Sequence, residues 1–167
     1  MKILHTADWH IGSFKGPEEN GINLRGEDTI ECLNELIRVA QKEQPDLILV
    51  SGDIFHQAEI WQGRSHKEVL KARSIILELS KNTKDIIVMR GTPNHDSEEA
   101  FLELKAHFEF IDNIHIVSDN KIVKLDNPDI FALYTPLSNP GIATISTLSS
   151  FTTSLSDIIC ILSMNSK

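Results

Sequence analysis

The stretch DLILVSGDIFH at residues 46–56 decides the fold class of this chain. Its apolar residues run without interruption from Leu47 to Val50 and do not alternate with polar ones. Such a run is typical of a strand that is buried on both faces of a largely parallel sheet. Gly52 then predicts a turn, which puts Asp53 directly after the strand. The stretch therefore indicates an α/β fold with a carboxylate at the end of a central strand.

The segments around this strand alternate between strand and helix patterns. Strands are expected at residues 3–7, 46–51, 86–89, 114–117, 122–125 and 130–134, helices at 28–44, 64–81 and 98–108, and a glycine-rich loop at 12–26. Pro45 should end the first helix, and Ser97 can cap the start of the third. With right-handed crossovers, this order predicts a layered α/β domain.

Polar side chains follow the first three long strands where each of them ends. Asp8 and His10 follow the first strand, Asp53 the second, and Asn94 and His95 the third. Taken singly, each motif is better explained as ordinary turn or capping chemistry. Ligands of open α/β sheets, however, gather outside the carboxyl ends of the strands. The shared placement therefore predicts one common site at this edge of the sheet.

The residue types at this edge suit a divalent metal. Carboxylate, imidazole and amide oxygen together fit Mn²⁺, Fe²⁺ or Zn²⁺. Asp53 stands at the centre of the set and could bridge two ions, the arrangement used in phosphoryl chemistry. His95 would then sit over a substrate phosphate, with Asp96 orienting its imidazole. His56 could contact the substrate, or it could be a solvated loop histidine.

The motifs in this order resemble those of the calcineurin-like metallophosphoesterases. The segments HTADWHIG at 5–12 and SGDIFH at 51–56 are similar to the SbcD-type branch of DNA repair nucleases, and the resemblance covers about residues 1–136. It implies a layered metallophosphoesterase-like sandwich and a two-manganese phosphodiesterase that acts on DNA. It also implies an ABC-type ATPase as partner and is compatible with a homodimer.

The resemblance implies a metal-binding role for four residues. Asp8 and His10 would bind the first Mn²⁺, Asp53 would bridge both ions, and Asn94 would bind the second.

The same motifs imply three residues that act on the substrate. His95 would stabilise the transition-state phosphate or protonate the leaving oxygen, Asp96 would orient His95, and His56 would lie close to the active centre.

Two features depart from the family pattern. Pro93 stands before the asparagine, where the pattern has glycine, and no histidine follows His115, although the family carries further histidine motifs downstream. We therefore expect residues 1–136 to be the N-terminal part of a nuclease domain that is incomplete at its C-terminus. Residues 137–167 would be a Ser/Thr-rich tail of unknown role. Two alternatives stay open: a non-catalytic remnant or binding module, and a phosphoesterase that acts on nucleotides or phosphoproteins.

Composition bounds the setting of the protein. The net charge of −8 predicts no broad basic face for nucleic acid, although bound cations would reverse the sign around an acidic site. The segment KILHTA at residues 2–7 is too short and too polar for the hydrophobic region of a signal peptide, and no stretch of eighteen apolar residues occurs. These features predict a cytoplasmic protein without a membrane span. Cys32 and Cys160 are expected to be reduced, buried thiols.

Overall fold

The computed structural model describes most of the chain. The described residues are 2–57, 66–118, 121–124, 130–135, 142–147 and 158–160, with side chains described for 2–57 and 67–118.

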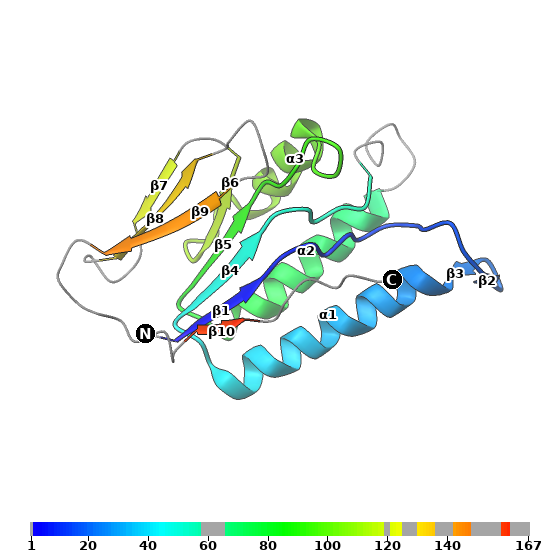
Figure 1. The fold of residues 1–167 in the computed structure, drawn as a ribbon, viewed down its shortest axis with the longest axis horizontal. Helices are drawn as coiled ribbons and strands as arrows, with labels where there is room; N and C mark the ends of the chain where they lie inside the picture. Colours follow the sequence, from blue (N-terminus) through cyan, green and yellow to red (C-terminus); the bar gives the residue numbers. More distant parts are fainter. Residues whose placement is uncertain are drawn as a thin grey trace.

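A parallel sheet forms the centre of the molecule (Figure 1). Its five strands lie in the order β10-β1-β4-β5-β6 and are β1 (Ile3–Thr6), β4 (Leu47–Ser51), β5 (Asp85–Met89), β6 (Ile114–Val117) and β10 (Ile158–Cys160). Every residue of β5 is buried, as are the first four of β4. Ile3 pairs with Leu47, and Leu47 with Asp85, so the first three long strands are in step and end at the same edge. The predicted α/β fold class is confirmed.

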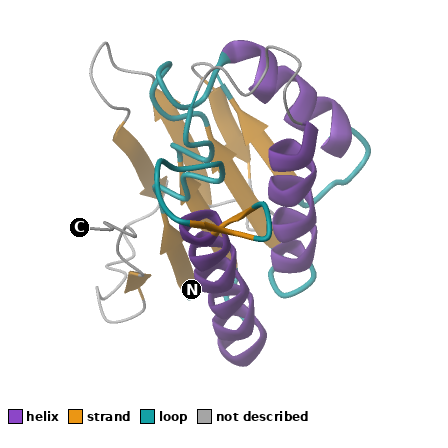
Figure 2. Cartoon of the chain, turned by 90° about the vertical axis from the view of Figure 1, so that its right-hand side faces the viewer, coloured by secondary structure: helices purple, strands orange, loops and turns teal. Residues whose placement is uncertain are grey.

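The helices of the described part are α1 (Leu24–Glu43), α2 (His66–Ser80) and α3 (Glu98–Phe108). Each connection from β1 to β6 moves one strand along the sheet in the same direction. With right-handed crossovers, this places all of these helices on one face of the sheet, as Figure 2 shows. Side chains such as Leu33, Ile76 and Phe101 fill the core between the helices and the sheet.

The first helix begins earlier than the sequence predicts. The expected loop at 12–26 contains a hairpin of β2 (Glu18–Glu19) and β3 (Ile22–Asn23), and the helix follows it directly. Asn20 and Gly21 both have positive φ, 52° and 77°, as a two-residue hairpin turn requires. The expectation of a start near residue 28 was therefore wrong, because an Asn-Gly hairpin signal was interpreted only as loop.

The cap of α1 explains why a glycine occurs inside the first turn of this helix. The Asn23 side chain accepts a hydrogen bond from the Gly26 N–H at 2.9 Å, which caps the helix. A Cβ on Gly26 would lie 2.9 Å from the Gly12 carbonyl oxygen, so glycine is needed for close approach rather than for a loop. At the other end Gln44 is left-handed (φ 45°), and Pro45 ends the helix as predicted.

The third helix matches its prediction. Ser97 has extended backbone, and its side chain accepts a hydrogen bond from the Ala100 N–H, so it is the N-cap. Glu98 and Glu99 lie in the first turn, where the helix dipole favours negative charge.

A separate antiparallel sheet contains β7 (Lys121–Lys124), β8 (Ile130–Thr135) and β9 (Ile142–Thr147). Both β9 and β10 belong to the Ser/Thr-rich segment 137–167, for which the sequence analysis predicted neither helix nor strand and gave no role. They pair with β8 and β1 respectively. Leu125, the last residue of one expected strand, lies outside the described residues.

Two minor expectations concern the surface. Cys32 is exposed on α1, so its prediction as a buried thiol was wrong; the side chain of Cys160 lies outside the described part. Among the described residues, no helix has both the length and the apolar character that crossing a membrane requires.

The cap of α1 can be tested by substitution. In Asn23→Ala the Gly26 N–H loses its acceptor and the Phe14 carbonyl loses a donor at 2.6 Å, so we expect a loss of about 1–2 kcal/mol in the free energy of unfolding, measured in urea. Asn23→Asp keeps the capping oxygen and should lose less. Equal stability of Asn23→Ala and the wild type would contradict this assignment.

Candidate metal centre

The loops that follow β1 and β4 run side by side beyond the ends of their strands. The backbone N–H groups of Asp8, His10 and Ile11 donate to the carbonyl oxygens of Gly52, Asp53 and Ile54 at 3.0, 3.0 and 2.8 Å. The two segments are thus locked in register, which fixes the relative positions of the first two motifs.

Three of the predicted metal ligands have left-handed backbone. Asp8, His10 and Asp53 have φ values of 55°, 50° and 51°. Residues other than glycine seldom adopt this conformation, and each instance costs on the order of 1 kcal/mol or more. Such strain persists where surrounding hydrogen bonds impose it, and it concentrates at functional sites. Its occurrence at these three positions supports the prediction that they form one site.

The ends of β4 and β5 meet through two glycines. A Cβ on Gly52 would lie 2.5 Å from the Gly91 Cα, and a Cβ on Gly91 would lie 2.1 Å from the Asp53 backbone nitrogen. Only glycine at both positions permits this approach. As a result, Asp53 Oδ1 accepts hydrogen bonds from the Thr92 N–H at 2.6 Å and from the Thr92 hydroxyl at 3.0 Å.

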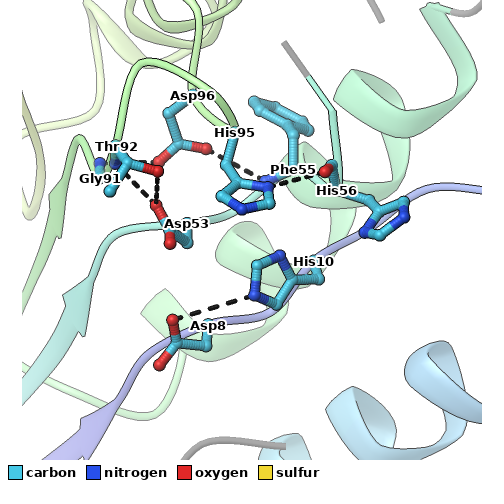
Figure 3. A network of polar contacts seen from close by, with 9 residues as sticks. All are labelled: Asp8, His10, Asp53, Phe55, His56, Gly91, Thr92, His95 and Asp96. Atoms are coloured by element: carbon cyan, nitrogen blue, oxygen red, sulfur yellow. Dashed lines mark hydrogen bonds and ion pairs between the residues drawn. The ribbon is translucent and has the colours of Figure 1, made fainter. Parts of the chain in front are cut away.

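The side chains of His10, Asp53 and His95 converge on one point (Figure 3). Each offers a nitrogen or carboxylate oxygen, and these atoms all lie within 4.8 Å of one another. Asp8 Oδ1 lies 3.9 Å from His10 Nε2 at the same edge. Nδ1 of His10 is buried and has no hydrogen-bond partner in the described part of the chain. This donor set fits a divalent ion of the Mn²⁺, Fe²⁺ or Zn²⁺ type.

The imidazole of His95 is held by a backbone group. Its Nδ1 lies 2.7 Å from the His56 carbonyl oxygen. Since a carbonyl can only accept, Nδ1 must carry the proton, which leaves Nε2 as the free nitrogen. The His95 ring lies against the His10 ring, with centroids 4.5 Å apart.

Asp96 does not make the contact expected of it. Its carboxylate is fully buried and accepts from the Phe55 N–H at 3.1 Å and the Gly91 N–H at 2.7 Å. The orienting contact to His95 comes from the His56 carbonyl instead. Burial raises the pKa of Asp96 to about 6, against the lowering effect of the backbone hydrogen bonds, and the Asp53 charge adds to the rise. Asp96 thus ties the β4 and β5 loops together beneath the site.

The turn at Pro93 preserves the third motif. The Thr92 carbonyl accepts from the His95 N–H at 3.0 Å and the Asp96 N–H at 2.8 Å. Proline is favoured at the second position of such a turn, so Pro93 fits where the family pattern has glycine. Asn94 lies in this turn and is exposed. Its role as a metal ligand stays a prediction.

His56 lies beside the cluster and not within it. Its ring centroid is 6.0 Å from that of His10 and 6.3 Å from that of His95. Burial lowers the pKa of His56, and repulsion from His10, His95 and Arg25 lowers it further. The ring distances, and the absence of His56 from the cluster of His10, Asp53 and His95, make it a neighbour of the site.

Trp9 lies between Asp8 and His10 in the sequence and packs into the core. It is buried, and its indole N–H donates to the Thr6 hydroxyl at 3.0 Å. Sequence reasoning missed Thr92 and the His56 carbonyl. A backbone acceptor leaves no signal in the residue type, whereas the small residues Gly91 and Thr92 after a buried strand were a usable signal.

Comparison with known proteins places these motifs in a family. The model of the calcineurin-like phosphoesterase family matches residues 1–160. The chain is 32% identical over 137 residues to the D component of the nuclease SbcCD from Staphylococcus saprophyticus, which covers 80% of this chain and 34% of the relative. It is 29% identical over 128 residues to the component of the same name from Staphylococcus epidermidis, covering 77% of this chain and 31% of that protein. The chain thus spans about a third of the length of these relatives.

The glycine contact between β4 and β5 gives a direct test of how Asp53 is placed. Gly91→Ala would drive a methyl group into the Asp53 backbone, so we expect a loss of about 1–3 kcal/mol in the free energy of unfolding, measured by chemical denaturation. Gly16→Ala is the matched control, because its Cβ would meet only the flexible Arg25 side chain at 3.2 Å. If the two variants were equally stable, the close approach would not matter.

Proposed function

The chain belongs to the calcineurin-like phosphoesterase family, and on that premise we propose that it hydrolyses phosphodiester bonds in DNA at a two-metal centre. The observation that carries the proposal is the convergence of His10, Asp53 and His95 within 4.8 Å at the ends of three parallel strands. The left-handed backbone of His10 and Asp53 adds support, because this conformation costs free energy and is concentrated at functional sites.

The metals proposed are two manganese ions. Asp8 and His10 would hold the first, Asp53 would bridge the pair, and Asn94 would contribute to the second. Bound divalent ions supply positive charge against the charge that develops on a phosphoryl group. The orientation of Asp53 is set in advance, because Thr92 already anchors one oxygen of its carboxylate.

His95 is the residue proposed to act on the substrate. Its Nδ1–H is engaged by the His56 carbonyl, so Nε2 is the nitrogen that can face a phosphate. In its protonated form the ring donates from Nε2 to a phosphoryl or leaving oxygen; in its neutral form Nε2 accepts a proton. The resemblance implies that Asp96 orients His95. Asp96 would do so indirectly, because its carboxylate binds the N–H groups of Phe55 and Gly91 and so holds the loops after β4 and β5 together.

The names of the relatives support the substrate proposed, and the family resemblance suggests the partner. Both relatives are named as part of a nuclease. We propose DNA as substrate, an ABC-type ATPase as the partner protein, a homodimer of this chain, and a cytoplasmic location.

A non-catalytic binding module is the second candidate. It is favoured by one observation on the described residues: His10, Asp53 and His95 converge on a single point, while Asn94 is exposed in its turn. Hydrolysis of DNA by the purified chain with Mn²⁺ would exclude it, and Mn²⁺ binding without hydrolysis would support it.

Asp53→Asn tests the metal centre. Asparagine tolerates the left-handed backbone and keeps an oxygen for Thr92, so the fold should survive while the charge is lost. We expect Mn²⁺ affinity and DNA hydrolysis to fall by more than the roughly 10–100-fold that outer-shell changes cause. Calorimetric titration and a nuclease assay measure the two effects. Asp28→Asn, an exposed position on α1, is the charge-matched control, and unchanged activity in Asp53→Asn would defeat the site assignment.

His95→Ala tests whether His95 acts as a general acid or base or instead binds a metal ion. We expect DNA hydrolysis to fall about 10²–10⁴-fold, the usual contribution of a general acid or base, with Mn²⁺ affinity largely kept. His107→Ala on α3, where the ring pairs with Glu103, is the control. Loss of Mn²⁺ binding in His95→Ala would instead make His95 a metal ligand, which its place in the cluster of three also allows.

A further inference from the structure

The position of His95 depends on His56 through its backbone and not through its ring. The His56 carbonyl accepts from His95 Nδ1 at 2.7 Å, whereas the two ring centroids are 6.3 Å apart. Whatever fixes the backbone of His56 therefore also fixes the imidazole proposed to act on the substrate.

Two contacts hold His56 from the side of β1. Its N–H donates to the Ile11 carbonyl at 3.1 Å. A Cβ on Gly12 would lie 2.8 Å from the His56 Cβ, so the two backbones are in close approach.

A third contact comes from the aromatic ring of Phe14. The centroids of the Phe14 and His56 rings lie 4.0 Å apart with a tilt of 36°. This is the shortest ring contact of His56, and aromatic pairs at such distances contribute about 0.5–1.5 kcal/mol beyond their burial. The side chain of Phe14 is half-buried although its neighbours Ser13 and Lys15 are exposed.

Phe14 is itself anchored to the start of α1. The Asn23 side chain donates to the Phe14 carbonyl at 2.6 Å and accepts from its N–H at 3.3 Å. The guanidinium carbon of Arg25 lies 5.1 Å from the ring centroid, within cation–π range. His56 and Arg25 already contact the ring, so less of its surface is available for stacking on a nucleobase.

We propose that Phe14 is a positioning residue, which packs on His56 and thereby keeps the His95 imidazole in its Nδ1–H orientation. The contacts run from Asn23 and Arg25 through Phe14 to the His56 backbone and then to His95. The effect on catalysis rests on the proposed function, whereas the effect on the His95 ring does not.

The test is a ¹⁵N NMR measurement of the His95 ring nitrogens in metal-free protein at about pH 8, above the pKa of free imidazole side chains. The wild type should show the Nδ1–H tautomer. In Phe14→Ala the ratio of tautomers should move about fivefold toward Nε2–H, the factor that one net hydrogen bond represents. Phe14→Tyr keeps the ring and should restore the wild-type signal. Phe110→Ala is the matched control, because Phe110 is 90% exposed beyond α3.

A second readout follows turnover on DNA. Phe14→Ala should lower kcat and leave KM unchanged, and Phe14→Tyr should recover kcat. Should Phe14→Ala fail to fold, Phe14→Leu supplies apolar volume without the ring for both measurements. An unchanged His95 tautomer in a folded ring-less variant would overturn the proposal. If the wild type does not hydrolyse DNA but the His95 tautomer still changes in Phe14→Ala, only the proposed function would be refuted.

Discussion

The close packing of Gly52 against Gly91 is the contact on which the rest of the site depends. Two neighbouring parallel strands end there without side chains between them, so the loops of β4 and β5 approach at backbone distance. That approach lets Thr92 hold the Asp53 carboxylate and lets Asp96 reach the N–H groups of Gly91 and Phe55. A polar network can form at this edge only because nothing apolar separates the strands.

The same edge stores conformational strain at the residues proposed to bind metal. Asp8, His10 and Asp53 all have left-handed backbone, and the hydrogen bonds between the β1 and β4 loops impose it. If these residues bind metal as proposed, their backbone is held before an ion binds, which limits the ordering that binding must cause. Trp9 and Phe55 adjoin these motifs in the sequence and are buried in the close-packed core, which resists relaxation.

The fold and the placement of the site could be predicted from sequence because they rest on side-chain patterns. Apolar runs followed by Asp8, Asp53 and His95 define strands and strand ends directly. The contacts of the Asp96 carboxylate and the His56 carbonyl could not be predicted, because the first depend on which backbone N–H groups are nearby and the second involves a backbone oxygen. Strands β9 and β10 were not predicted because a Ser/Thr-rich segment gives no clear alternation, and because β10 pairs with β1, which is far away in the sequence.

The central claim is that His10, Asp53 and His95 surround a divalent metal centre at the end of the parallel sheet. The most direct measurement is a crystal structure of the protein with Mn²⁺, recorded with anomalous scattering to locate the ion. We expect a manganese peak within coordination distance of both the Asp53 carboxylate and the His10 imidazole. Manganese bound elsewhere on the protein, with no peak at Asp53, would contradict this claim.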